Sequence, residues 1–585
     1  MKLSLDEQLQ QLRSKATELV LREDWQEYIN LYSHLISLCR HHLLSGSDDV
    51  ASGSLQRTLC LAHSNRAEAL FRTRDLSGAL HDCDSALDLD PAHVKSLLCK
   101  TRVLLDLHRY SPASDCLKLA LAGQTTGTAA AEAARELLER CRKLEAQSRS
   151  GKLDISDWVL NGFSEKCPDL AEYVGPVEIR RSDNGGRGLF ATKSLEAGTP
   201  LVVTRAVAIE RGILPESGDV HGESARMVMW KDFVDMILKI ADKCSRTLYL
   251  IYQLSTGTEQ SEPQIPDAGL FKPDAADELF DRESKELDID RILKILDVNC
   301  LTEEEFSSKI QGKQNNYYGV GLWLLPSFVN HSCAPNARRL HIGDRVVIHA
   351  SRDVKAGEEI TYAYFDVLSP LDNRRKMAKR WGFECGCERC KFEVASCFSQ
   401  EMRDLEMAMK GGANIEGVVV RLEEGLRKWM VKRKEKGFLR ASLWQAYSSV
   451  YESERLMRRC GRRIPAAAAV AESGLLDSEK HFAFYGAYHS NPTNVFIHAL
   501  FVWPIFYTSL ILFHFTTPLL NLPSWLGGDV LVLNLGFVFA AIFGLFYVFM
   551  DRKAGSLAAV LCILCWIGSA HLARRLGFSL AWKVC

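Results

Sequence analysis

One segment of the chain, residues 326–390, concentrates the side chains that could do chemistry. It begins PSFVNHSCAPN, continues through GEEITYAYFDV and closes with FECGCERC. Its cysteines offer the four thiolates that a closed, tetrahedral zinc site of the structural kind uses: Cys333, Cys385, Cys387 and Cys390. Reduced core thiols are the alternative, but such thiols have no reason to cluster as tightly as the last three do. We therefore predict a zinc site that contributes to folding and ties the end of this segment to its beginning.

Two pairs of polar side chains accompany these cysteines. Asn330 and His331 lie between an apolar run and a turn of small residues, directly before Ser332 and Cys333. Tyr362 and Tyr364 are two positions apart and should share one face of a strand. A core tyrosine and a structural histidine are the plain alternatives for Tyr364 and His331. Because the predicted zinc site would bring these residues together, we expect them to frame a pocket.

The composition is that of a globular protein with several domains. The 585 residues predict two to four domains. The 72 lysines and arginines nearly balance the 73 aspartates and glutamates, so no overall field favours nucleic acid and no direct nucleic-acid binding is expected. The chain has 18 cysteines but no apolar signal segment at its start, which indicates a reducing compartment.

Residues 1–150 show the apolar spacing of helices and an internal repeat. ALHDCDSALDLDP and ASDCLKLAL match at a period of 34, with small residues where paired helices approach and Pro91 where a helix should stop. The pattern resembles the tetratricopeptide repeat (TPR), with residues 5–43 as a degenerate copy. It implies a helical solenoid whose concave surface binds a peptide or a partner protein. A plain helical bundle is the alternative.

After Gly151 the sequence alternates in the manner of strands. Turns are expected at 183–188 and 196–198, and residues 353–357 are expected to form the hairpin between the last two strands. Residues 212–295 are polar and mostly helical, which we interpret as an insertion between two halves of one β-rich domain. The GGRG turn is a weak signal by itself, and the sequence holds no Walker, HExxH or GxSxG motif.

Four stretches, in this order and spacing, resemble the SET domain of protein lysine methyltransferases: GRGLFATKSLEAG, VGLWLLPSFVNHSCAPN, GEEITYAY and FECGCERC. The pattern is similar to the split SET domain of the SET-and-MYND family and extends over residues 175–392. The insertion holds a single cysteine, Cys244, so the zinc-binding MYND module of that family is absent. The resemblance implies a β-rich SET domain with a zinc site after it, and methyl transfer from S-adenosylmethionine to a lysine of a protein substrate.

The same resemblance assigns roles to individual residues. It implies that the Tyr364 hydroxyl lies at the methyl-transfer centre, with Tyr362 as the second candidate. A free lysine amine is mostly protonated at neutral pH, so an aromatic channel that disfavours the ammonium form would help the reaction. The resemblance further implies contacts with S-adenosylmethionine from the main chain of Arg187, Gly188 and Leu189 and from Asn299, Ser327, Asn330, His331, Tyr364 and Phe383.

Residues 399–475 are predicted to return to helix, with the basic stretch EEGLRKWMVKRKEKG on a solvated face. Beyond them charge becomes scarce, and residues 495–515 and 530–550 form apolar runs long enough to cross a bilayer. A third run, 556–573, is marginal. Basic residues after the second run favour a cytosolic loop there, so we expect a membrane-attached chain whose TPR-like and SET parts face the cytosol.

Residues 481–585 begin with HFAFYGAYHSNPTNVFIHALFVWPIF, which resembles the N-terminal half of the iron-dependent 2-hydroxy fatty acid dioxygenases of the endoplasmic reticulum. The resemblance implies an endoplasmic-reticulum membrane location and Fe²⁺ ligation by His489 and His498. The second histidine motif of that family does not occur in the sequence up to Cys585. A membrane anchor with interfacial histidines is therefore the preferred interpretation. If the segment is instead a fusion of two gene products, the remainder would be cytoplasmic or nuclear.

The leading hypothesis is a multidomain, membrane-tethered protein lysine methyltransferase. It combines a TPR-like solenoid, a SET domain with its zinc site, a helical region and transmembrane helices. One alternative is a TPR adaptor with a degenerate SET core, against which Asn330, His331 and Tyr364 argue because all three are present. Another is a lipid dioxygenase fragment with a passenger SET domain, against which the missing second histidine motif argues.

Overall fold

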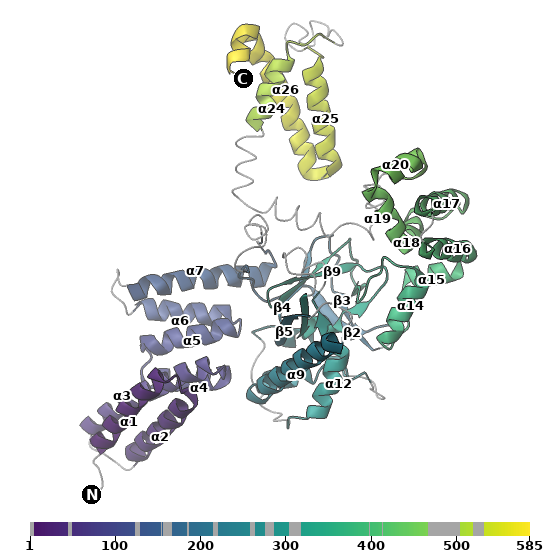
Figure 1. Cartoon of the computed structure of the whole chain (residues 1–585). Helices are drawn as coiled ribbons and strands as arrows, with labels where there is room; N and C mark the ends of the chain where they lie inside the picture. The colour runs from purple at the N-terminus through teal and green to yellow at the C-terminus, as the bar shows by residue number, and fades with distance from the viewer. Residues whose placement is uncertain are drawn as a thin grey trace. The chain divides into compact units, whose positions relative to one another are not determined.

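A computed structural model gives the architecture of the chain (Figure 1). It describes residues 5–44, 49–122, 129–153, 155, 167–183, 186–214, 220–257, 264–274, 286–303, 317–396, 398–411, 414–465, 503–518, 532–550 and 552–584. These residues divide into two compact units, one within 1–153 and 161–481, the other within 154–160 and 482–585. The predicted multidomain fold class is confirmed, because helices come first, a β-rich part follows and helices complete the chain.

The N-terminal part is a stack of helices, each packed on the next (Figure 1). They are α1 (Leu5–Leu21), α2 (Trp25–Leu44), α3 (Asp49–Arg72), α4 (Leu76–Leu89), α5 (Val94–Asp106), α6 (Tyr110–Ala122) and α7 (Ala129–Ser150). The Asp75 side chain caps α4 by accepting a hydrogen bond from Gly78 N, and the helix ends before Pro91, as predicted. The small and apolar residues of the repeat are buried between helices, at Ala79, Cys83, Ala86, Ala113, Leu117 and Ala120.

Three small sheets form the β-rich part. Their strand orders are β1-β4-β10-β9, β2-β3-β11-β8 and β5-β7-β6. The strands are β1 (Tyr173–Val174), β2 (Val177–Arg181), β3 (Arg187–Ala191), β4 (Pro200–Arg205), β5 (Ala208–Ile213), β6 (Leu301–Thr302), β7 (Tyr317–Leu322), β8 (Asn330–His331), β9 (Ala337–Ile342), β10 (Arg345–Ala350) and β11 (Glu359–Tyr362). β11 pairs in parallel with β8, which sets Thr361 opposite Asn330 and Tyr362 opposite His331.

The prediction that residues 353–357 form a hairpin between β10 and β11 is wrong. β10 is hydrogen-bonded to β4 on one side and to β9 on the other, so it has no free edge for β11. The turn instead carries the chain from one sheet to another, where β11 pairs with β3 and β8. This crossing brings the end of β11 next to the short strand β8.

The insertion is helical in its described part, as predicted. It contains α9 (Val220–Lys243), α10 (Ser245–Ile251), the 3₁₀ helix η1 (Ala268–Phe271) and α12 (Ile289–Asn299). A second 3₁₀ helix, η2 (Leu325–Phe328), follows β7 and leads directly into β8. The insertion and the sheets share one apolar core, in which Trp323, Ile360 and Tyr362 are almost fully buried.

Short helices continue the chain after β11. They are α14 (Leu371–Arg380), α15 (Glu388–Ala395), α16 (Ser399–Lys410), α17 (Ile415–Lys428), α18 (Arg433–Ser442), α19 (Trp444–Glu452), α20 (Glu454–Cys460) and η3 (Gly461–Arg463). The basic stretch of the sequence does not form one helix, because Met430 adopts a left-handed φ of 49° between α17 and α18. Helices α16 to α20 surround their own apolar core.

The second unit contains three apolar helices in its described part: α24 (Trp503–Phe513), α25 (Leu535–Met550) and α26 (Arg552–Val584). Among the described residues, the 23-residue stretch Ser556–Phe578 is long and apolar enough to cross a membrane, with a mean hydropathy of 1.9. The sequence predicts the corresponding run, residues 556–573, as only a marginal candidate for a membrane span. It is longer than expected because the helix continues through Arg574 and Arg575, whereas α24 and α25 have 11 and 16 residues.

Candidate active site and zinc centre

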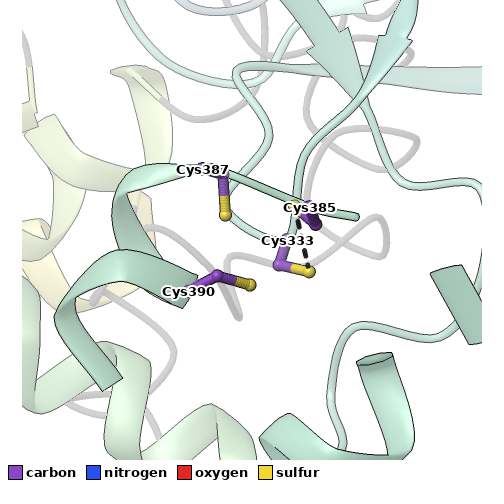
Figure 2. Close-up of side chains that lie close together, drawn as sticks. All are labelled: Cys333, Cys385, Cys387 and Cys390. Carbon is purple, nitrogen blue, oxygen red and sulfur yellow. Dashed lines mark hydrogen bonds between the residues drawn. The ribbon is translucent and has the colours of Figure 1, made fainter. Parts of the chain in front are cut away.

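Four cysteine sulfurs converge on a space that suits one metal ion (Figure 2). Cys333 follows β8, Cys385 and Cys387 precede α15, and Cys390 lies in α15. The four sulfurs all lie within 4.8 Å of one another, and those of Cys333 and Cys385 are 3.8 Å apart. Tetrahedral sulfurs at a zinc–sulfur distance of about 2.3 Å would be separated by about 3.8 Å. The donor set and its spacing therefore fit a structural zinc ion.

The crowding of the four thiols favours a cation among them. Contact with Cys333 lowers the pKa of the Cys385 thiol, while contact with Cys385 raises the pKa of the Cys333 thiol. Thiols that compete for protons in this way cannot all ionise unless a cation lies between them. A zinc ion would meet that need, because it binds cysteine as the thiolate.

Two buried arginines pack against the cysteine cluster, and the sequence did not predict them as part of the site. Arg389, fully buried, donates to the Cys333 carbonyl oxygen at 3.2 Å and to Glu393 at 2.7 Å. Arg374, 1% exposed, donates to the other oxygen of Glu393 at 2.9 Å. Both also donate to the Ser442 hydroxyl of α18. The signal in the sequence was an arginine inside the CERC motif, where a thiolate-rich site needs positive charge.

His331 connects the cysteine cluster to the predicted methyl-transfer residue, Tyr364. Its Nδ1 accepts a hydrogen bond from the main-chain nitrogen of Tyr364 at 3.0 Å, which assigns the ring proton to Nε2. Nε2 lies 3.3 Å from the Cys333 sulfur and can donate to it. The ring also stacks on Phe365, with ring centroids 4.3 Å apart. Both nitrogens are therefore engaged within the protein, and a cofactor would meet the ring carbons or the main chain.

Tyr362 and Tyr364 direct their hydroxyls at the same short segment. Tyr364 donates to the Val329 carbonyl oxygen at 2.8 Å, and Tyr362 donates to the Pro326 carbonyl oxygen at 3.2 Å. Their ring centroids are 5.5 Å apart, although β11 ends at Tyr362 and Tyr364 lies just beyond it. Burial raises the pKa of Tyr364, so its hydroxyl stays protonated at neutral pH. This favours a positioning role for the hydroxyl over that of a general base.

Gly188 lies where β3 approaches the Asn330 side chain. The Asn330 amide donates to the Arg187 carbonyl oxygen at 3.0 Å and to a Glu359 carboxylate oxygen at 2.7 Å. A Cβ on Gly188 would lie 2.3 Å from that Glu359 oxygen and 3.1 Å from the Asn330 nitrogen. Glycine is thus required for this close approach. The Asn330 side chain holds β3, β8 and β11 together at the point where the sequence predicted a cofactor.

The other predicted cofactor residues surround the same turn. The Ser327 hydroxyl donates to a main-chain carbonyl at 2.8 Å and lies 3.4 Å from the carbonyl oxygen of Asn299. The Asn299 amide donates to two further carbonyls, both at 2.7 Å. The Phe383 ring centroid is 5.4 Å from that of His331 and 6.0 Å from that of Tyr364. Residues from five separate segments, 187–189, 299, 327–331, 362–364 and 383, therefore meet in one neighbourhood. His489 and His498, the predicted iron ligands, lie outside the described residues.

Two parts of the chain match known protein families. Residues 186–365 match the family model of the SET domain. The chain contains a SET domain. Most of the predicted site lies within the matched part of this SET domain, while Phe383 and three of the cysteines follow it. Residues 475–575 match the model described as 2-hydroxy-palmitic acid dioxygenase Mpo1-like, so the resemblances to the SET domain and to the dioxygenase family are confirmed.

Individual relatives are similar to parts of this chain. A methyltransferase of Gibberella zeae is 25% identical over 470 residues, which cover 76% of this chain and 60% of the relative. Human histone-lysine N-methyltransferase SMYD3 is 42% identical over 74 residues, 12% of this chain and 17% of the relative. The chain thus spans less than two thirds of either relative. The TPR2B domain of yeast Sti1, solved in a complex with pHsp70, matches 23% of this chain and 96% of its own, at 20% identity and a TM-score of 0.19.

Proposed function

We propose that this protein is an S-adenosylmethionine-dependent protein-lysine N-methyltransferase. The observation that carries the proposal is the meeting of Tyr364, the Asn330–His331 strand and the cysteine cluster within and next to the SET domain. The similarity to a methyltransferase over three quarters of the chain supports it. The shorter similarity to SMYD3 supports lysine as the acceptor.

The residues that would hold S-adenosylmethionine come from both sides of β8. The main chain of Arg187, Gly188 and Leu189 would run along the cofactor, and Phe383 would cover its adenine. Ser327, Asn299 and the Asn330–His331 strand would contact the rest of the molecule. The cofactor supplies a methyl group on a sulfonium, which needs a correctly aligned amine more than it needs acid or base catalysis.

The protein's task is then to orient the lysine amine and to exclude water. Tyr364 remains protonated and donates to the Val329 carbonyl, so its oxygen keeps a fixed position and can still accept a hydrogen bond. The rings of Trp381 and Phe383 lie 5.3 and 6.0 Å from the Tyr364 ring and give this site an apolar wall. Such a wall disfavours the ammonium form of an entering lysine, whose pKa in water is about 10.4.

The decisive experiment compares the full-length protein with its Tyr364→Phe variant in detergent, using labelled S-adenosylmethionine and cell extract. We expect labelled lysines with the wild type and at least about a tenfold loss with the variant, because the amine loses its positioning hydroxyl. Equal labelling by both proteins would remove Tyr364 from the mechanism. No labelling by either would favour the adaptor hypothesis.

We further infer that the helical repeat binds a peptide or protein partner and that the second unit attaches the protein to the endoplasmic-reticulum membrane. The first inference is supported by the stacked helices α1–α7, the second by the apolar stretch Ser556–Phe578 and the match to the Mpo1-like family. Extraction of cell membranes with alkaline carbonate tests the attachment. Release of the full-length protein into the soluble fraction would contradict it.

A further inference from the structure

One helix beside the proposed site has an unusually cationic outer face. Five of the ten residues of α14 are lysine or arginine and one is acidic, Asp372, which gives a net charge of +4. Arg374 is buried, and the other four basic residues are exposed on one side of the helix: Arg375, Lys376, Lys379 and Arg380. None of these four forms an ion pair with another described residue. Their charge is therefore available to a partner.

The inner face of α14 fixes the helix in place. The Arg374 guanidinium donates to the Ser369 carbonyl at 2.6 Å, to the Ser442 hydroxyl at 3.2 Å and to Glu393 at 2.9 Å. Ala378, one turn later, is also buried. The helix is thus held against α15 and α18, so its outer cations project from a rigid element. A helix that is already held in place loses less conformational entropy when a partner binds.

The C-terminal end of α14 leads directly to the proposed methyl-transfer centre. Trp381 is the C-cap residue of α14, and its ring centroid lies 5.3 Å from that of Tyr364. Trp381 is also 43% exposed, so it reaches from the surface to the tyrosine. Arg380 directly precedes Trp381. A peptide whose target lysine lies at Tyr364 would therefore place residues only a few positions from that lysine against the cationic face.

Helix stability alone does not account for these charges. Lys379 and Arg380 lie in the last turn, where basic side chains complement the helix dipole. Arg375 and Lys376 lie in the middle of the helix, where that effect is lost. Glu388 of α15 pairs with Lys434 of α18 and not with a basic residue of α14.

We propose that the outer face of α14 recognises acidic residues next to the target lysine, so that substrates carry aspartate or glutamate near the methylated position. The inference rests on the proposed methyltransferase function and names its substrate class. Opposite charges on the two partners speed encounter and fix the direction of the bound peptide. A protein substrate is favoured over nucleic acid because the face leads to a site for an amine and because the whole chain carries a net charge of −1.

The test uses the full-length protein and three lysine peptides of one length, in which the flanking residues are acidic, neutral or basic. The variant reverses three charges, Lys376→Glu, Lys379→Glu and Arg380→Glu. The matched control reverses three exposed basic residues elsewhere that also lack ion pairs among the described residues, Arg421→Glu, Lys428→Glu and Lys432→Glu. Values of kcat/KM are measured for each peptide at low and high salt, with and without a DNA oligonucleotide as competitor.

We expect the wild type and the control to prefer the acidic peptide over the neutral one. The α14 variant should lose about tenfold in kcat/KM on the acidic peptide through KM, keep its rate on the neutral one and gain on the basic one. Salt near 0.5 M should reduce the wild-type preference, because the Debye length falls to about 4 Å.

Two outcomes would overturn the inference while leaving the proposed function intact. One is methylation of all three peptides at equal rates by the wild type. The other is a preference for the acidic peptide that the α14 variant retains. Competition by DNA that disappears in the α14 variant, without any preference among peptides, would assign the face to nucleic acid instead. Absence of methyl transfer to peptides and to cell extract alike would reject the proposed function, and the inference with it.

Discussion

Arg389 donates a hydrogen bond from Nη1 to the main-chain carbonyl oxygen of Cys333, 3.2 Å away, although 56 positions separate the two residues. The same guanidinium reaches Glu393, Ser442 and the Val367 carbonyl. Four thiolates around one zinc ion carry a net charge of −2, while Arg374, Arg389 and Glu393 together carry +1. Arg374, Arg389 and Glu393 would therefore offset half of the charge of a zinc ion bound by the four cysteines, and they connect the cysteine cluster to helix α18.

The first prediction concerns this buried charge. Replacement of Arg389 by Met should lower the free energy of unfolding by about 3–5 kcal/mol, because Glu393 would lose a partner inside the protein. The zinc should also dissociate faster in the presence of a chelator. Urea denaturation and chelator kinetics measure the two effects. Lys391→Met is the matched control, since Lys391 is exposed on the same helix. Equal stability and equal zinc release in both variants would contradict the proposed role of Arg389.

The second prediction concerns the metal. The wild-type protein should contain one zinc ion per chain, and Cys387→Ser should remove it, because structural zinc sites need all four ligands. Elemental analysis of the purified proteins gives the metal content, and thermal unfolding reports the accompanying loss of stability. Cys244→Ser serves as control, since Cys244 lies outside the cluster. A Cys387→Ser protein with undiminished zinc would show that the four sulfurs do not form the site.

The third prediction separates the two tyrosines. Tyr362 is 1% exposed and its hydroxyl binds the Pro326 carbonyl, so Tyr362→Phe should cost about 1–2 kcal/mol of stability and change KM little. Tyr364→Phe should act mainly on kcat, since its hydroxyl lies at the proposed methyl-transfer centre. Urea denaturation and steady-state kinetics on the same preparations distinguish the two. The reverse pattern would make Tyr362 the functional residue.

Part of this site could be predicted from the sequence, and the rest depends on pairings that a sequence does not display. The four cysteines and the tyrosine pair stand out because residues of their kind seldom cluster on a solvated surface. Arg374 and Ser442 do not stand out, because 68 positions separate them and both types usually face water. The hairpin predicted at residues 353–357 was wrong for the same reason, because the sequence does not display which strands pair. Two consecutive strands with a tight turn normally pair, but here β4 and β9 already occupy both edges of β10.

The fourth prediction tests the glycine of β3. Gly188→Ala should weaken binding of S-adenosylmethionine at least about tenfold. The new methyl group would push the side chains of Glu359 and Asn330 away from β3, the strand proposed to run along the cofactor. Isothermal titration with the cofactor or its demethylated product measures the change. Gly53→Ala in α3 is the control, as a Cβ there meets nothing within 4 Å. Unchanged affinity in Gly188→Ala would mean that β3 does not line the cofactor site.

The last prediction is a pH dependence of stability caused by Glu406 in α16. Burial, reinforced by the nearby Asp372 and Glu393, raises the pKa of this carboxyl to about 7. A folded pKa above the unfolded value means that the folded state binds the extra proton, so stability falls as the pH rises from about 4.5 to 7. Glu406→Gln keeps the neutral form at every pH.

We therefore expect Glu406→Gln and the wild type to be equally stable near pH 4.5 and the variant to be more stable by up to about 2 kcal/mol at pH 8. Urea denaturation across this range measures the difference. Glu401→Gln, an exposed position in the first turn of the same helix, should show no such trend. A constant difference between Glu406→Gln and the wild type at all pH values would show that Glu406 titrates normally. The gain should come first from the burial of Glu406 and second from the negative charges of Asp372 and Glu393, which both favour the neutral side chain.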